Sequence, residues 1–246
     1  MANTSRISRI LPQANVDTVD ASNRGARYGE QYVVDLYGTK HLLADEGSYF
    51  VATNTTPGTA IALITSITAY AASGAATAAV LVLTNTESRS ATAPKRIYFD
   101  YIKLLCVDVP TGATSWRYAL VLDDNPIRYT SGGSQIYPVN ANGDSSVATI
   151  AKMYFGETVT AVVNNARTVG RGILRGVIPT TFDTFVIVSG GAEGGGSDVS
   201  AAASGRFVDV TAPIIIGAQQ NLVLSLWGAS NAGASTWEFE CGWWER

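Results

Sequence analysis

The chain has 246 residues, of which 46% are hydrophobic and only 15% are charged, and its formal net charge is −3. So few charges, against roughly 25% in an ordinary globular domain, predict that partners bury part of the surface. The net negative charge argues against a nucleic-acid-binding surface, which needs clustered Lys and Arg. Polar and small residues interrupt the apolar run at 60–83, so we expect no membrane span.

Residues 1–28 show no hydrophobic periodicity and are predicted to form an N-terminal arm. It begins without the apolar segment of a secretion signal, so we expect synthesis in a cytoplasm. Either the arm is a partly ordered tail, or it docks on a partner and becomes ordered on contact. In the second case, charge-assisted and apolar contacts would come from Arg6, Ile7, Arg9, Ile10 and Leu11.

Residues 29–246 are predicted to form one all-β domain, a jelly-roll-like β-sandwich. Short β-rich runs alternate with Gly, Ser, Thr, Asn and Pro, which is typical of sandwiches and barrels. A long connection at 190–203 favours a jelly roll over an up-and-down barrel. The Ala-rich run 69–79 allows a helix as an alternative. We expect strands near 31–37, 48–54, 60–69, 77–84, 96–109, 115–123, 134–139, 147–153, 158–163, 168–178, 182–189, 205–210, 213–216, 221–227 and 235–244.

Alternation assigns faces within two of these strands. In 96–109 one face is expected to hold Ile97, Phe99 and Tyr101 and the other Tyr98, Asp100 and Ile102. Arg167, Arg171 and Arg175 recur at every fourth position, so they are expected to share a face. That stripe either pairs with acidic residues of a neighbouring strand or subunit, which we favour, or is solvated.

No catalytic, cofactor-binding or metal site is predicted. The single histidine, His41, has no adjacent nucleophile or acid. The carboxylates Asp123 and Asp124 precede a turn, and Glu238 and Glu240 fit the wet face of a strand better than an acid/base pair.

Two further motifs lack the features that chemistry requires. Residues 140–144 faintly resemble a calcium loop but lack its first Asp and final Glu, so a hairpin turn is favoured. The glycines at 170–176 lie within a β run and are therefore no dinucleotide fingerprint. Cys106 and Cys241 lie in apolar β patterns and are predicted to be reduced core thiols rather than a disulfide.

The strand expected at 235–244 alternates large apolar residues with Glu238 and Glu240. Its rings are too large to leave in water, so they lie either in a subunit contact or in the subunit's own core. We favour a homo-oligomer, specifically a trimer, because interfaces are enriched in aromatic residues. Its contacts are then expected to include part of the set Trp227, Trp237, Trp243 and Trp244.

The segments 213–227 (PIIIGAQQNLVLSLW) and 237–246 (WEFECGWWER) resemble the ending of small virion structural proteins of tailed bacteriophages. The resemblance implies a jelly-roll-like, trimeric capsid decoration (cement) protein, or a related head or tail accessory protein. Its partner would be the major capsid protein or another virion protein, and its location the virion, after synthesis in the bacterial host. A tail or receptor-binding carbohydrate-binding module is the main alternative, and a β-sandwich hydrolase is the third.

Overall fold

A computed structural model describes residues 24–25, 31–32, 39–54, 61–62, 80–108, 116–124, 129, 133–155, 167–175, 182–190, 206–228 and 236–246. This part of the chain is nearly all β, as expected, and has one helix, α2 (Thr39–Asp45). The strand expected at 158–163, the possible helix at 69–79 and the connection 191–203 lie outside the described residues.

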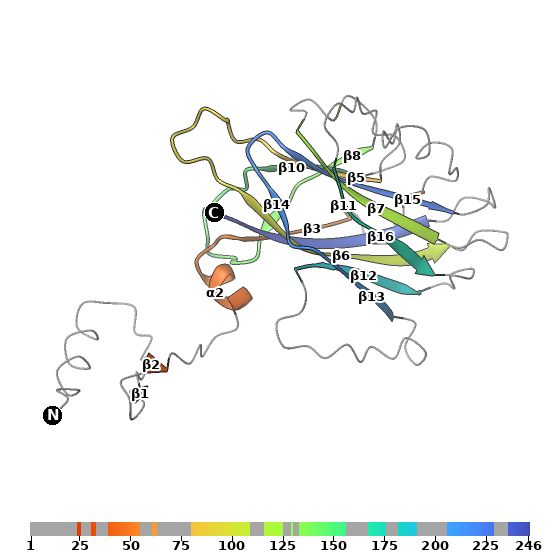
Figure 1. Cartoon of the computed structure of the whole chain (residues 1–246), viewed down its shortest axis with the longest axis horizontal. Coiled ribbons are helices and arrows are strands. Elements are labelled where there is room, and N and C mark those ends of the chain that lie inside the picture. Colours follow the sequence, from red (N-terminus) through yellow and green to blue (C-terminus); the bar gives the residue numbers. More distant parts are fainter. Residues whose placement is uncertain are drawn as a thin grey trace.

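Eight strands form the body of the molecule (Figure 1). In chain order they are β3 (Tyr49–Thr53), β5 (Leu81–Asn85), β6 (Ile97–Asp108), β7 (Trp116–Asp123), β11 (Arg167–Arg175), β12 (Thr184–Ser189), β15 (Asn221–Gly228) and β16 (Thr236–Glu245).

These strands pair as though one long hairpin had been rolled up. The first pairs with the last, the second with the seventh, and so on: β3–β16, β5–β15, β6–β12 and β7–β11, all antiparallel. Two further antiparallel ladders, β16–β6 and β15–β7, join them into sheets ordered β3–β16–β6–β12 and β5–β15–β7–β11. This winding is a jelly roll, so the predicted fold class is confirmed.

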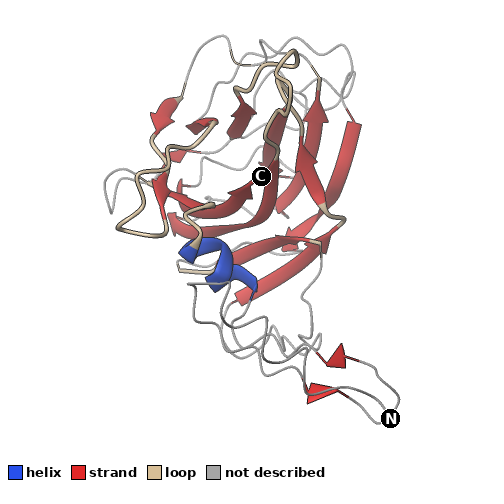
Figure 2. Cartoon of the chain, turned by 90° about the vertical axis from the view of Figure 1, so that its left-hand side faces the viewer, coloured by secondary structure: helices blue, strands red, loops and turns tan. Residues whose placement is uncertain are grey.

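Shorter strands extend this framework. The smaller sheet gains β10 (Ala151–Phe155) and β8 (Ser134–Ile136), and the larger gains β9 (Val139–Asn140) and β13 (Arg206–Thr211), the latter parallel to β12. The remaining short strands are β14 (Ile214–Ile216), β4 (Ile61–Ala62), β1 (Arg24–Gly25) and β2 (Gln31–Tyr32). The helix α2 lies beside one end of the larger sheet (Figure 2).

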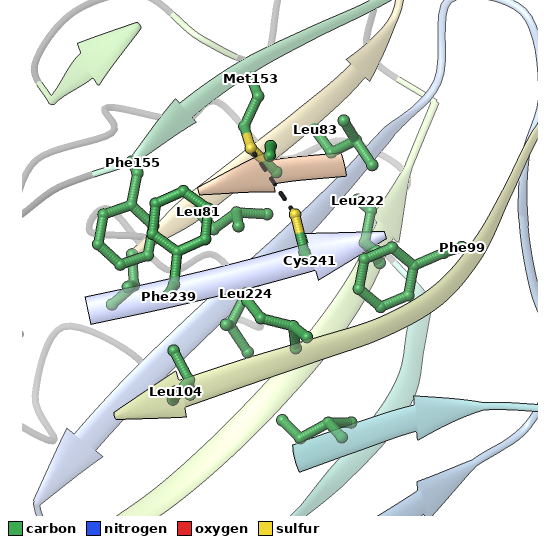
Figure 3. Packing of buried hydrophobic residues seen from close by; sticks show 14 of the residues in the cluster. Leu81, Leu83, Phe99, Leu104, Met153, Phe155, Leu222, Leu224, Phe239 and Cys241 are labelled. Atoms are coloured by element: carbon green, nitrogen blue, oxygen red, sulfur yellow. Dashed lines mark hydrogen bonds between the residues drawn. The ribbon is translucent and has the colours of Figure 1, made fainter. Parts of the chain in front are cut away.

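One continuous hydrophobic core fills the space between the two sheets (Figure 3). Phe155 of the smaller sheet stacks on Phe239 of the larger one, with ring centroids 4.1 Å apart. Cys241 and Met153 meet in the same layer, their sulfur atoms 3.9 Å apart. Cys106 and Cys241 are both buried free thiols, which confirms their prediction. At the β11/β13 edge, the Tyr118 hydroxyl donates a hydrogen bond to Asp209 across the sandwich.

A bulge in β6 corrects the face assignment made for that strand. Gly242 pairs with Tyr101 and Trp243 with Phe99, so Asp100 is an extra residue without a cross-strand partner in β16. An extra residue reverses the alternation that follows it. Ile97 and Phe99 share a face, as predicted, and are buried in the core, but beyond the bulge it is Ile102 that is buried, while Tyr101 turns outward.

Two bulges in β11 likewise divide the predicted arginine stripe. Arg167 pairs with Leu122 and Arg175 with Trp116, but the register shifts twice between them, and Arg171 pairs with Ala119. Leu122 and Ala119 have opposite strand parity, so Arg167 and Arg171 do not share a face. Arg167 does have an acidic neighbour, because its guanidinium lies 3.9 Å from Asp124.

Candidate binding surface on the larger sheet

A polar network lies on the outer face of the larger sheet, where α2, β3 and β6 meet. At its centre is Asp100, the extra residue of the β6 bulge, whose side chain is only 6% exposed. Its carboxylate accepts a hydrogen bond from the Tyr49 hydroxyl at 2.6 Å and lies 2.8 Å from the Lys40 ammonium. Since Lys40 belongs to α2, this ion pair ties the helix to the sheet.

A second carboxylate, Glu240 of β16, continues the network toward β6. It accepts hydrogen bonds from the Tyr101 hydroxyl at 2.7 Å and from the Lys103 ammonium at 3.3 Å. Tyr101 reaches Glu240 because the bulge at Asp100 turns its side chain outward. The bulge therefore supplies one member of the network directly and orients another.

Electrostatics keep the two tyrosine hydroxyls of this network neutral and its Glu240 carboxylate ionised. Burial, followed by the hydrogen bond to Asp100, raises the pKa of Tyr49 far above its usual range. Burial and the hydrogen bond to Glu240 do the same to the pKa of Tyr101. The Tyr101 hydrogen bond, aided by Lys103, lowers the pKa of Glu240, so this carboxylate stays ionised at neutral pH.

Gly242 allows the two tyrosines to pass close to β16. A Cβ atom at this position would lie 2.5 Å from the Tyr49 hydroxyl oxygen and 2.7 Å from a ring carbon of Tyr101. Both rings are held by hydrogen bonds to buried or half-buried carboxylates, so neither can move aside without losing its partner.

We therefore expect Gly242→Ala to lower the free energy of unfolding by about 1–3 kcal/mol, as overpacking usually does. Denaturant titration followed by fluorescence measures the loss. Gly143→Ala is the matched control, because no atom lies within 4 Å of a Cβ atom there. Equal losses in the two variants would show that the space above β16 is not tightly filled.

Two hollows open on this face and meet at the Lys103–Glu240 ion pair. The larger, about 660 Å³, is lined by Lys40, Tyr101, Lys103, Thr184, Val186, Val188 and Glu240. The smaller, about 220 Å³, is lined by Thr53, Asn54, Lys103, Leu105, Glu238, Phe239 and Glu240. We call the two together the outer groove. Its size is in the range of ligand sites, and its lining combines ionised, hydroxyl and apolar groups.

The acidic residues considered from the sequence have structural partners. Glu245 is buried and accepts hydrogen bonds from Thr149, the Ile150 backbone N–H and the Trp243 indole, both of the latter at 3.0 Å. The Ile150 N–H is thus bonded to Glu245 rather than to the neighbouring strand, and β10 begins at Ala151, later than predicted. Asp124 accepts a hydrogen bond from Gln220.

The turn at 140–144 is fastened to the corner between α2 and β3. The Asn140 amide donates to the Gly47 carbonyl at 2.8 Å, and the Asn142 amide donates to the Asp45 carbonyl at 3.1 Å. Within the described residues no group of three or more His, Cys, Asp or Glu side chains is arranged to hold a metal ion. His41 is exposed on α2, and no helix in this part of the chain is long and apolar enough to span a membrane.

The predicted partner-binding residues differ in how exposed they are and in whether the structure describes them. Trp237 and Trp243 are 0% exposed within the single chain, as in the alternative that placed the tryptophans in the core. Trp244 is half-buried and stacks on Tyr98 with ring centroids 5.6 Å apart, so it is the member of this pair of neighbours that a partner can reach. Trp227 pairs with Arg117 in the β15–β7 ladder. The arm residues Arg6, Ile7, Arg9, Ile10 and Leu11 lie outside the described part.

The polar network and the outer groove were not predicted from the sequence as a site. Glu238 and Glu240 were considered, but only as the wet face of a strand. Tyr49 and Asp100 are 51 positions apart, and Tyr101 and Glu240 are 139 apart, so no local spacing links them. The available signal was Asp100, an ionisable residue flanked by Phe99 and Tyr101, which fits a regular alternation equally well.

No protein-family model, curated protein or solved structure matches this chain. The function is therefore inferred from the architecture, the described surface and the resemblance of the two C-terminal segments to phage virion proteins.

Proposed function

We propose that this protein is a non-enzymatic structural component of a bacteriophage virion, a decoration protein that binds the preformed capsid shell and stabilises it. Its partner is the major capsid protein or another virion protein. The observation that carries the proposal is the complete eight-strand jelly-roll winding, because this architecture recurs in viral capsid and lectin domains. The resemblance of residues 213–227 and 237–246 to phage virion proteins favours the first of these uses.

An exposed apolar edge supports assembly into a homo-oligomer, which we propose to be a trimer. Tyr137, Val139 and Val147 are 71%, 63% and 42% exposed. They lie close together, because the Asn140 amide also contacts the Val147 carbonyl at 3.3 Å. The strand β9 is the last of its sheet among the described residues, and exposed apolar edges favour pairing with another chain. We assign this edge to the contact between copies.

Sedimentation at micromolar concentration tests the assembly. The wild-type protein is expected to be trimeric, and the double variant Tyr137→Asp, Val139→Asp to be monomeric with an unchanged circular dichroism spectrum. Ile173→Asp is the control, since Ile173 is an exposed apolar residue on the opposite edge strand, β11. A monomeric wild-type protein would contradict the proposed trimer.

We expect deletion of residues 2–20 to weaken attachment to capsids while leaving the melting temperature within about 2 °C. The arginines and apolar residues of the arm provide contacts that are lost with the deletion. Because several arms of one oligomer engage together, the measured loss is expected to exceed tenfold. If the truncated protein decorated particles as tightly as the full chain, the arm would have no docking role.

The proposed function is tested by adding the purified protein to capsids assembled without it. Saturable binding is expected, together with increased resistance of the particles to heat or to mechanical stress. Binding to bacterial surface glycans with none to capsids would instead favour the receptor-binding module.

A further inference from the structure

We propose that the outer groove binds a neutral oligosaccharide. This inference goes beyond the proposed function, because it gives the protein a second ligand besides the capsid. That ligand would bind on the outer face of the larger sheet. The groove crosses β12, β6, β16 and β3 in that spatial order. Three inter-strand steps span roughly 14 Å, which suits a short chain of sugars better than a single one.

The groove carries charges of both signs, and each of its lysines is already paired with a carboxylate: Lys40 with Asp100 and Lys103 with Glu240. Lys40 and Lys103 contribute two positive charges, and Glu238 and Glu240 two negative ones. A charged ligand would therefore meet an opposite charge and a like charge within the same groove. A neutral ligand with many hydroxyl groups has no such conflict, because hydroxyls donate to carboxylates and accept from ammonium groups.

The lining of the groove also contains apolar groups. They are the ring of Tyr101 and the side chains of Leu105, Val186 and Val188. A sugar ring presents C–H groups on its faces and hydroxyls at its rim, so it can contact both kinds of surface at once. The two classes of contact together would recognise a chain of such rings.

The network around Glu240 holds the centre of the groove in place before a ligand arrives. Glu240 is fixed by Tyr101 and Lys103 from β6. Nearby, Tyr49 is fixed by Asp100, which also holds α2 through Lys40. Groups that are already ordered lose little conformational entropy on binding, so even a shallow site retains useful affinity.

The test is isothermal titration of the full-length protein with neutral hexasaccharides of glucose, mannose and galactose, with sialylated and sulfated oligosaccharides as charged comparisons. At least one neutral chain is expected to bind saturably and more tightly than any charged one. Tyr101→Ala and Glu240→Gln are each expected to weaken that binding at least tenfold. Tyr101→Phe keeps the ring and removes only the hydroxyl, so a smaller loss is expected.

Matched controls are Tyr154→Ala, a tyrosine of β10 in the smaller sheet and outside the groove, and Glu87→Gln, a glutamate outside its lining. Both should leave the dissociation constant per subunit unchanged. Thermal melts check that every variant is folded. Capsid attachment of the Tyr101 and Glu240 variants is expected to be normal, which separates this inference from the proposed function. Absence of saturable binding to any neutral chain, preference for a charged one, or loss of capsid attachment in the groove variants would each overturn it.

Discussion

Trp237→Ala is expected to lower the free energy of unfolding by about 3–5 kcal/mol, the usual cost of removing a large core side chain. Trp237 has no exposed surface in the single chain. Its ring meets Trp116 edge to face, with centroids 6.0 Å apart, and lies 5.3 Å from the ring of Phe185. The three rings come from both sheets, so the cavity left by the substitution cannot close by moving one strand alone. Denaturant unfolding under two-state conditions measures the loss.

Trp244→Ala is the matched control, because the same residue type lies seven positions further along the same strand and is only half-buried. About 1–2 kcal/mol is expected for this variant, since less apolar area leaves water. Unfolding should be measured at several protein concentrations. A Trp237→Ala loss no larger than that of Trp244→Ala, or one that disappears on dilution, would place Trp237 in a contact between subunits instead.

The jelly roll could be predicted because its signals are local and repeated. Strands such as 221–228 and 236–245 combine β-branched or aromatic residues with flanking turn residues. These features can be recognised in the sequence whatever the strands later pack against. The short helix α2 was missed because its own signal is not repeated along the chain. Seven residues give two turns, which is too few for a helical period to stand out from the neighbouring sequence.

The faces of individual residues were harder to predict than the strands themselves. Alternation assigns a face only while the register is regular, and a bulge is a property of two paired strands rather than of one. Asp100 in β6 and the two register shifts in β11 reversed assignments that were correct up to those points. The polar network, and the place of Tyr101 in the outer groove, follow from the β6 bulge, so they too could be seen only in the folded chain.

The free energy of unfolding is also expected to fall strongly in alkaline solution. Three tyrosine hydroxyls, those of Tyr49, Tyr101 and Tyr118, donate to the carboxylates of Asp100, Glu240 and Asp209. In each case burial, followed by the hydrogen bond to that carboxylate, raises the pKa of the tyrosine well above its usual value. Burial also raises the pKa of the Cys241 thiol. All four groups keep their protons in the folded protein where the unfolded chain would release them.

The sign of the pH dependence follows from this difference. A raised pKa in the folded state means that its stabilising effect is complete below the unfolded pKa and is lost as pH rises toward the folded value. Unfolded Cys releases its proton near about pH 8.5 and unfolded Tyr near about pH 10. We therefore expect stability to decline gently above about pH 8.5 and steeply above about pH 10. Each tyrosine contributes about 1.4 kcal/mol per pH unit, so the three together contribute about 4 kcal/mol per pH unit near pH 11.

Urea titrations between pH 7 and pH 11.5 measure this slope, and absorbance at 295 nm reports when tyrosinate forms. Tyr118→Phe keeps the buried ring and removes one of the four protons that the fold retains, so the slope above pH 10 is expected to fall by about one quarter. Formation of tyrosinate at all eleven tyrosines of the folded protein, ahead of unfolding, would contradict the buried, hydrogen-bonded state of these three hydroxyls. So would a Tyr118→Phe slope equal to that of the wild type, since the proton removed would then not be one that the fold retains.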